Sequence, residues 1–193
     1  GNLKIGGGFP IAVQSMTNTP TSNVRATVNQ IKKLTEAGCE IIRVGIPDLK
    51  SAKALGEIKK RINIPIVADI HFSAQLALEA IRQGVDKIRI NPGNFPGEGL
   101  KEVAESAKKN KIPIRIGINS GSLEKDILKK YGGATALALV ESALRNIKLM
   151  EKLEFYNLVI SLKASDVLRT MEAYEIISRK TKYPLHLGVT EAG

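Results

Sequence analysis

The sequence predicts an α/β protein in which parallel strands alternate with helices and close into a (β/α)8 barrel of the TIM type. Three observations lead to this prediction. Short apolar runs alternate with amphipathic stretches along the whole chain, and the joins between them repeatedly contain Gly or Pro. Polar and charged residues also stand at the ends of several consecutive apolar runs. The first two observations indicate βα units, and the third favours a barrel because its strand ends face one centre.

The apolar runs are expected to be the strands. Strands separated by helices pair in parallel and are buried on both faces, so they consist mainly of Val, Ile and Leu. Right-handed crossovers between them allow either a barrel or a doubly wound sheet. The runs are Ile11–Val13, Ile41–Ile46, Ile64–Ile70, Lys87–Ile90, Ile112–Ile118, Leu158–Leu162 and Leu185–Val189.

The strand count leads to the domain prediction. Seven strands are expected, whereas a complete barrel has eight, and Gly193 directly follows the seventh run. We therefore expect residues 1–193 to be one substrate-binding barrel domain that is incomplete at its C-terminal end, without its eighth strand.

Helical patterns fill the stretches between the apolar runs. Asn23 is expected to cap the first helix, and Gly38 to end it. The longest connection, Ser120–Gly133, is expected to contain a short helix and to serve function, as long loops at strand ends often do. The other expected helices are Lys50–Arg61, Ser73–Gln83, Gly99–Lys109, Ala134–Leu153 and Asp166–Lys180.

Composition excludes several classes of protein. Hydrophobic residues make up 43% of the chain and charged residues 25%, which is an ordinary globular balance. No apolar run approaches the roughly 20 residues that span a bilayer, and no secretory leader is visible, so a cytoplasmic protein is expected. Cys39 is the single cysteine, so no internal disulfide is possible, and one thiol cannot hold a metal cluster alone. It is expected to be buried and inert.

The net charge of +10 comes largely from basic pairs near the ends of the expected helices. Cations there are solvated and favour the negative pole of the helix dipole. Nucleic-acid binding is disfavoured, because only 4% of the residues are aromatic and no recognition motif is present.

Polar and charged residues inside the expected strands carry the main functional prediction. Side chains alternate faces along a strand, so Asp69 shares a face with His71 and Lys163 with Ser165, and each polar set is expected near the C-terminal end of its strand. The candidate cations Arg43, Arg89, Arg115 and Lys163 outnumber the nearby anions Asp69 and Glu191 by about two. A bound phosphate or diphosphate is therefore expected to neutralise the excess positive charge. The candidate binding residues are Arg43, Asp69, His71, Arg89, Asn91, Arg115, Asn119, Lys163 and Ser165.

Weaker candidates lie at the edges of the same runs. Glu191 is expected to be an acid or base, or a partner for a cation, and His186 is equally consistent with a ligand contact and a core position. The segments Gln14–Thr17 and Asn91–Asn94 are expected either to contact a ligand or simply to end a strand.

Several strings of the sequence are similar to the barrel domain of the 4-hydroxy-3-methylbut-2-enyl diphosphate synthase family of the non-mevalonate pathway. The resemblance runs the length of the chain in the same order. It is carried by Val13–Thr19 (VQSMTNT), Val67–Phe72 (VADIHF), Ile88–Asn94 (IRINPGN), Ile114–Asn119 (IRIGIN), Gly121–Asp126 (GSLEKD), Leu162–Asp166 (LKASD) and Pro184–Gly193 (PLHLGVTEAG).

The resemblance implies a reaction, cofactor and partners. The family reductively opens and dehydrates 2-C-methyl-D-erythritol 2,4-cyclodiphosphate, with electrons that ferredoxin or flavodoxin delivers through a 4Fe–4S cluster. Three cysteines and a glutamate in a second domain hold that cluster, so no metal ligand is expected in this stretch. A homodimer is also implied, in which the cluster domain of one subunit caps the barrel of the other. This stretch is expected to bind substrate but to be inactive alone.

The resemblance also implies roles for single residues. Glu191 matches an acidic residue near the reacting carbon, a candidate proton donor. The residues that match diphosphate ligands are Arg43, Arg89, Arg115 and Lys163, and those that match the polar lining of the mouth are Asp69, His71, Asn91, Asn119 and Ser165.

Two other functions remain open from the sequence. One is a different barrel enzyme with an anionic substrate, such as a pterin-dependent transferase, which would need no cluster. The other is a non-catalytic module that binds anions or nucleic acid, for which RNA should compete with the cyclic diphosphate.

Overall fold

The computed structural model describes residues 2–95 and 97–190, and the chain divides into two compact units. The first unit contains residues 1–90 and 94–114, and the second contains residues 91–93 and 115–193. Strands alternate with helices in both, which confirms the predicted α/β class. Within the described residues, no helix is both long and apolar enough to cross a membrane.

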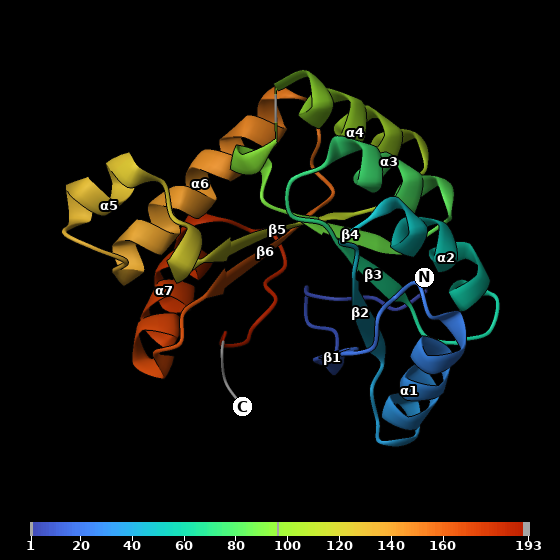
Figure 1. Ribbon diagram of the computed structural model, residues 1–193. Coiled ribbons are helices and arrows are strands. Elements are labelled where there is room, and N and C mark those ends of the chain that lie inside the picture. The colour runs from blue at the N-terminus through green and yellow to red at the C-terminus, as the bar shows by residue number, and fades with distance from the viewer. Residues whose placement is uncertain (1, 96, 191–193) are drawn as a thin grey trace. The chain divides into compact units, whose positions relative to one another are not determined.

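The first unit is a parallel sheet with one layer of helices. The spatial order of its strands follows the sequence, and its helices succeed one another along one side of these strands (Figure 1). The strands are β1 (Gln14–Met16), β2 (Ile41–Gly45), β3 (Ile66–Asp69) and β4 (Lys87–Ile90), and the helices are α1 (Val24–Glu36), α2 (Leu49–Lys59), α3 (Ala74–Arg82) and α4 (Gly97–Lys109).

The helices of this unit begin and end where local chemistry requires it. The side chains of Asn23, Asp48 and Ser73 accept hydrogen bonds from the first turns of α1, α2 and α3, which satisfies backbone donors that have no partner inside the helix. Gly38 follows α1 with a φ of 97°, a conformation that glycine adopts without strain, so the predicted end of this helix is confirmed.

The register of the sheet brings candidate residues of neighbouring strands together. Arg43 lies opposite Val67, and Asp69 lies opposite Arg89 on the adjacent strand. The core on either side is formed by side chains that are completely excluded from solvent, including Ile42, Ile66 and Ile88. Parallel pairing therefore places the last residue of β3 beside a cation of β4.

The first strand lies further along the chain than the sequence predicted. We expected Ile11–Val13, but β1 is Gln14–Met16, and Ile11 and Val13 are 87% and 56% exposed. Pairing starts with Gln14 opposite Ile41, the first residue of β2, so the residues before Gln14 extend past the end of β2. The prediction followed apolar character, whereas the strand is defined by its partner.

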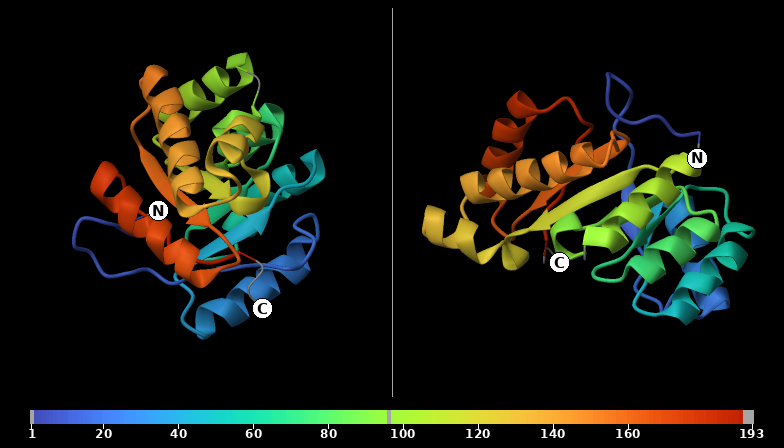
Figure 2. Two further views of the ribbon diagram at one scale, coloured as in Figure 1. Left: turned by 90° about the vertical axis from the view of Figure 1, so that its left-hand side faces the viewer. Right: turned by 90° about the horizontal axis from the view of Figure 1, so that it is seen from above.

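The second unit contains the longest helix of the described residues, and α6 and α7 pack against each other and against β6 (Figure 2). Its buried residues include Ile116, Ile147, Ile160 and Ile177. The short helix expected in the Ser120–Gly133 connection is confirmed as α5. The elements are β5 (Ile114–Asn119), η2 (Ser120–Ser122), α5 (Lys125–Tyr131), α6 (Ala136–Lys152), β6 (Leu158–Lys163) and α7 (Val167–Lys180), while η1 (Pro92–Asn94) joins the units in sequence.

The seventh expected strand, Leu185–Val189, is wrong as a regular strand. This segment forms a single parallel bridge, between Ile160 and Leu185. Regular pairing stops after it because a side chain of α7 occupies the next position of the ladder, as shown below.

Candidate functional site

The carboxylate of Asp69 is the centre of a charged cluster in the first unit. Its Oδ1 atom lies 3.1 Å from Nη1 of Arg89, and its Oδ2 atom lies 3.7 Å from Nε of Arg43. Nε2 of His71 also lies 3.7 Å from Oδ2. We call Arg43, Asp69, His71 and Arg89 the Asp69 cluster. The structure thus brings together four of the five candidates that the sequence placed on the second, third and fourth strands, Asn91 being the fifth.

Burial makes the charge of this cluster significant. The side chains of Asp69 and Arg89 are only 6% and 7% exposed, and that of Arg43 is 20% exposed. One carboxylate therefore faces two guanidinium groups away from bulk water. Water screens charges only weakly in such a place, so an anion bound beside the two guanidinium groups would be strongly attracted to them.

Burial has the largest influence on the pKa of Arg43. Burial lowers the pKa of this guanidinium from its ordinary value, and the positive charge of Arg89 acts in the same direction. The negative charge of Asp69 opposes both effects without cancelling them. An anion bound beside Arg43 would act in the same direction as Asp69 and favour the charged guanidinium.

Met16 belongs to the same neighbourhood. Nε of Arg43 donates a hydrogen bond to Sδ of Met16, at 3.0 Å. The sequence offered the segment Gln14–Thr17 only as a weak candidate, because a thioether carries no charge to signal a site. The pairing of Met16 with Arg43 in the β1–β2 register is what places it there.

The second unit carries the remaining candidates at and beyond the ends of β5 and β6. Asn119 and Lys163 are the last residues of these two strands, and both are half-buried. Ser165 is exposed in the turn before α7, and the neighbouring Asp166 caps this helix. The prediction that polar groups stand at strand ends is confirmed for these positions.

Arg115 differs from the prediction. It is the second residue of β5 rather than a residue of its C-terminal half, and it is only 1% exposed. The sequence indicated the face of the strand but not the depth, because the strand extends only one residue before Arg115. A guanidinium this deeply buried requires charge or hydrogen-bond compensation.

Asn91 is buried, and its side chain is engaged locally. Its Oδ1 atom accepts a hydrogen bond from the backbone N–H of Gly93 at 3.2 Å, and Oδ1 of Asn146 accepts from the same N–H at 2.8 Å. The N–H of Gly93 is therefore bound within the turn that follows β4, which agrees with the alternative in which this segment only ends the strand. Glu191, the candidate acid, lies outside the described residues.

The described residues do not fit an iron–sulfur cluster. Cys39 is buried, as predicted, and its thiol donates to the backbone oxygen of Ile41 at 3.0 Å. No group of three His, Cys, Asp or Glu side chains gathers in the part of the chain that the structure describes.

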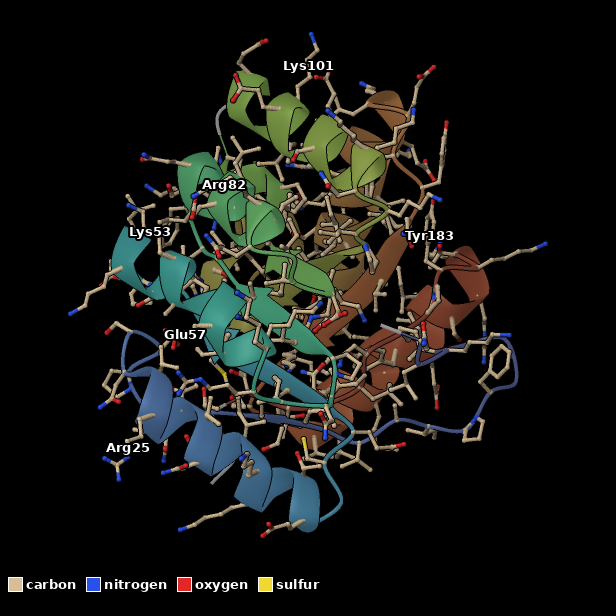
Figure 3. The ribbon with its side chains drawn as sticks, turned by 90° about the vertical axis from the view of Figure 1, so that its right-hand side faces the viewer. Arg25, Lys53, Glu57, Arg82, Lys101 and Tyr183 are labelled. Atoms are coloured by element: carbon tan, nitrogen blue, oxygen red, sulfur yellow. The ribbon has the colours of Figure 1, made fainter. Side chains whose placement is uncertain are left out.

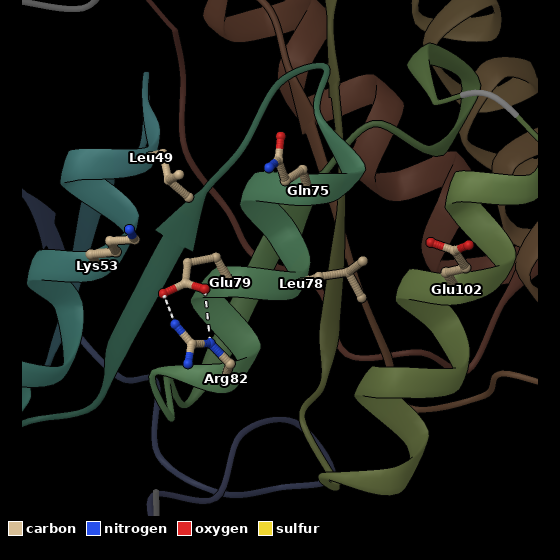
Figure 4. A pocket seen from close by; sticks show the side chains of 7 residues that line it. All are labelled: Leu49, Lys53, Gln75, Leu78, Glu79, Arg82 and Glu102. Atoms are coloured by element: carbon tan, nitrogen blue, oxygen red, sulfur yellow. Dashed lines mark hydrogen bonds and ion pairs between the residues drawn. The ribbon is translucent and has the colours of Figure 1, made fainter.

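The outer faces of both units carry pockets of a different character. Charged residues such as Lys53 and Arg82 project from the outer side of the first unit (Figure 3). A pocket of about 480 Å³ lies there between α2, α3 and α4, and in it Arg82 binds Glu79 through two hydrogen bonds of 2.7 and 2.8 Å (Figure 4). Because this carboxylate already neutralises the arginine, the pocket does not match an anionic ligand as the Asp69 cluster does.

The outer pocket of the second unit contains Tyr183. It has a volume of about 610 Å³ and is also lined by Glu151, Arg179, Lys180 and Lys182. The hydroxyl of Tyr183 donates to Glu151 at 2.9 Å. The pKa of Tyr183 is raised to about 12. Burial is the larger cause of this shift, and the carboxylate of Glu151, which accepts the hydrogen bond, is the second.

Comparison with protein families gives one match over the whole chain. Residues 1–193 match the family described as GcpE TIM-barrel domain. This match supports the predicted barrel fold.

Curated relatives share extensive identity with the chain. A protein of Caldanaerobacter subterraneus subsp. tengcongensis is 62% identical over 100% of this chain and 55% of its own length. A protein of Thermodesulfovibrio yellowstonii is 58% identical over 100% of this chain and 56% of its own length. Both are named 4-hydroxy-3-methylbut-2-en-1-yl diphosphate synthase (flavodoxin). The chain thus spans about half the length of the curated relatives it matches.

Solved structures with a similar fold include dihydropteroate synthases. That of Yersinia pestis has a TM-score of 0.61 and 14% identity, covering 90% of this chain and 68% of its own. That of Stenotrophomonas maltophilia has a TM-score of 0.62 and 16% identity, covering 88% of this chain and 66% of its own. At this identity the likeness shows a shared fold alone.

Proposed function

Because the chain belongs to the GcpE TIM-barrel domain family, we propose that it is the substrate-binding barrel of a 4-hydroxy-3-methylbut-2-enyl diphosphate synthase. Its ligand is 2-C-methyl-D-erythritol 2,4-cyclodiphosphate, called the cyclic diphosphate below. The observation that carries the proposal is the Asp69 cluster, in which two buried guanidinium groups share one carboxylate.

The residues of the first unit have distinct proposed roles. Arg43 and Arg89 bind diphosphate oxygens, because the planar guanidinium matches two oxygens at once. Asp69 holds both arginines in place and, as an anion, does not itself contact the diphosphate. His71 is exposed enough to reach the same ligand.

The second unit contributes further binding residues. Lys163 supplies a compact positive charge at the end of β6, and Arg115 supplies a second charge from deeper in the core. Polar contacts are assigned to Asn91, Asn119 and Ser165. Glu191 is proposed as the proton donor near the reacting carbon, on the resemblance alone.

For the whole protein we propose the reductive ring opening and dehydration of the cyclic diphosphate to 4-hydroxy-3-methylbut-2-enyl diphosphate. A 4Fe–4S cluster, held outside this stretch, supplies the two electrons, which come from flavodoxin or ferredoxin. The printed names of the relatives specify flavodoxin for those proteins. We further propose a cytoplasmic homodimer.

The proposal is tested by calorimetric titration of the cyclic diphosphate into the wild type, Arg43→Ala and Arg82→Ala. These two arginines are matched, since each lies beside one carboxylate, but only Arg43 is in the Asp69 cluster. Arg43→Ala should weaken binding by about tenfold or more, because a hydrogen bond to a charged group is worth about 1.5–3 kcal/mol. Arg82→Ala should bind like the wild type.

Three results would contradict the proposal. Equal affinity of the wild type and Arg43→Ala would remove the role of the cluster. Tighter binding of a pterin diphosphate than of the cyclic diphosphate would favour a pterin-dependent transferase. Displacement of the cyclic diphosphate by RNA would favour a nucleic-acid-binding module.

A further inference from the structure

The segment 184–190 runs beside β6, and its backbone hydrogen bonds are regular at both ends but interrupted in the middle. At one end Ile160 N–H donates to Pro184 at 2.9 Å, and His186 N–H donates to Ile160 at 2.8 Å. At the other end Thr190 N–H donates to Ala164 at 3.1 Å. A continuous parallel ladder would next join Leu162 N–H to the carbonyl of His186.

The hydroxyl of Tyr174, on α7, occupies that position. It accepts a hydrogen bond from Leu162 N–H at 2.9 Å and donates one to the carbonyl oxygen of His186. A tyrosine hydroxyl can do both at once, so both backbone groups keep a partner although they do not bind each other. Tyr174 is only 6% exposed, which means that this insertion is part of the core.

The hydroxyl is held in its protonated form. Burial raises the pKa of Tyr174, while the hydrogen bond from Leu162 and the positive charge of Arg115 act in the opposite direction without reversing the shift. A protonated hydroxyl is required for donation to His186.

A second residue of α7 supports the same stretch of β6. The Oγ1 atom of Thr170 accepts a hydrogen bond from Ala164 N–H at 3.3 Å. Thr170 and Tyr174 are four residues apart and therefore lie on one face of the helix. Together they bind the N–H groups on either side of Lys163, so α7 fixes the backbone from which this cation extends.

The interrupted ladder also defines the space beside Lys163. Gly188 lies in the segment that follows the inserted hydroxyl, and a Cβ atom built on it would lie 3.4 Å from Nζ of Lys163. The ammonium group therefore lies close against a residue without a side chain. A larger residue there would compete with it for the same space.

We propose that Tyr174 is a positioning residue for Lys163. Its hydroxyl, inserted between β6 and the segment 184–190, fixes the opening in which the Lys163 ammonium lies. It thereby sets the direction in which this cation meets the diphosphate. The inference rests on the proposed function, because Lys163 is assigned there to the diphosphate. It adds a residue of the outer helical layer that touches no ligand.

The test is a double-mutant cycle on binding of the cyclic diphosphate, measured by calorimetry. Tyr174→Phe removes one oxygen atom and should weaken binding by about fivefold when Lys163 is present. In a Lys163→Met background the same change should have no effect, because the residue through which it acts is gone. Tyr183→Phe, which removes a hydroxyl from the outer face of the same unit, is the matched control and should leave affinity unchanged.

A second variant approaches the same space without altering Tyr174. Gly188→Val adds a branched side chain beside Nζ of Lys163 and also strains the backbone, because the φ of Gly188 is 158°. It should weaken binding by about tenfold in the presence of Lys163 and by clearly less in its absence, where only the backbone strain remains. Thermal melts of each variant separate lost affinity from lost folding.

The outcomes distinguish this inference from the proposed function. If the wild type does not bind, or Lys163→Met binds like the wild type, the assignment of Lys163 to the diphosphate fails. If Lys163→Met binds weakly but Tyr174→Phe binds normally, or Tyr174→Phe weakens binding equally in both backgrounds, the positioning role is overturned and the proposed function stands. Unchanged affinity of Gly188→Val would overturn it as well.

Discussion

Charged residues on the outer helices and on the inner strands of this protein are arranged in opposite ways. On the helices the ion pairs lie at the surface: Arg82 binds Glu79, and Arg145 lies 2.8 Å from Asp126. These arginine side chains are 68% and 45% exposed. On the strands of the first unit, Arg43 and Arg89 share Asp69, and the group is largely buried.

The two arrangements differ in how strongly water screens the charges. Exposed pairs gain little, with typical contributions of about 0–1 kcal/mol, because water screens them. Buried ion pairs are screened far less, so removing one partner is costly. The net charge of +10 therefore says little about where an anion would bind, whereas Arg43, Asp69 and Arg89 are conspicuous because they stand inside largely apolar strands.

The strongest test of this contrast is removal of the shared carboxylate. Asp69→Ala leaves two buried guanidinium groups facing each other, and we expect the free energy of unfolding to fall by about 3–5 kcal/mol. Urea denaturation monitored by circular dichroism measures this loss. Asp126→Ala, which removes a carboxylate that is 65% exposed, should cost far less, because water screens its pair with Arg145.

The melting temperature of the same variant is a second test of the charges on the strands. Inorganic pyrophosphate should raise the melting temperature of Asp69→Ala more than that of the wild type, because it replaces the missing negative charge. If Asp69→Ala and Asp126→Ala were equally stable, the distinction between the two layers would be wrong.

The sequence predicted the helices and the inner strands better than the strands at either end of the series. Caps such as Asn23 and Gly38 act locally, and β2 to β4 are short, largely buried strands rich in Ile and Val, so their pattern is visible in the chain itself. The predictions of the first and seventh strands were wrong for a common reason. Their extent depends on partners: β2 for the residues near Gln14, and the hydroxyl of Tyr174 for the segment after Leu185.

The sequence indicated which face of each strand the candidate residues occupy, but not how deeply they are buried or which residues support them. Period-two alternation selected Asp69, Arg89 and Lys163 because a charged residue inside an apolar run is conspicuous. The same pattern could not show that Arg115 lies deep in the core. It also could not reveal Tyr174, since an aromatic residue on the buried face of a helix has the same signature as any core residue.

The packing of the outer layer should affect stability and leave binding unchanged. A Cβ atom on Gly99 would lie 2.9 Å from Cβ of Ala74, closer than carbon atoms normally approach, so α3 and α4 would have to separate. We expect Gly99→Ala to lower the free energy of unfolding by about 1 kcal/mol, since strain of about 1–3 kcal/mol outweighs the better helix propensity of alanine.

Gly97→Ala is the control for this change, because no atom lies within 4 Å of the corresponding Cβ position. It should be neutral or slightly stabilising in the same denaturation experiment. Affinity for the cyclic diphosphate should match the wild type in both variants. A loss of affinity in Gly99→Ala would show that the helical layer and the binding site are not separable.

The smallest expected effect concerns the pH dependence of stability at Tyr183, on the outer face of the second unit. Its pKa is raised to about 12, first by burial and then by the carboxylate of Glu151. A raised pKa means that the folded state holds the proton more tightly than the unfolded state, whose tyrosine titrates near 10. The hydroxyl therefore contributes stability that is complete below about pH 10 and is lost as the pH rises towards 12.

The measurement is the difference in free energy of unfolding between the wild type and Tyr183→Phe across this range. Subtraction of the variant removes the lysines that titrate over the same interval. The difference should be constant up to about pH 9.5 and then shrink by about 1 kcal/mol or less, because solvent screens this partly exposed group. A difference that stayed constant to pH 12 would show that Glu151 does not hold the proton on Tyr183. A large loss would place Tyr183 with the buried charges of the strands rather than with the screened pairs of the helices.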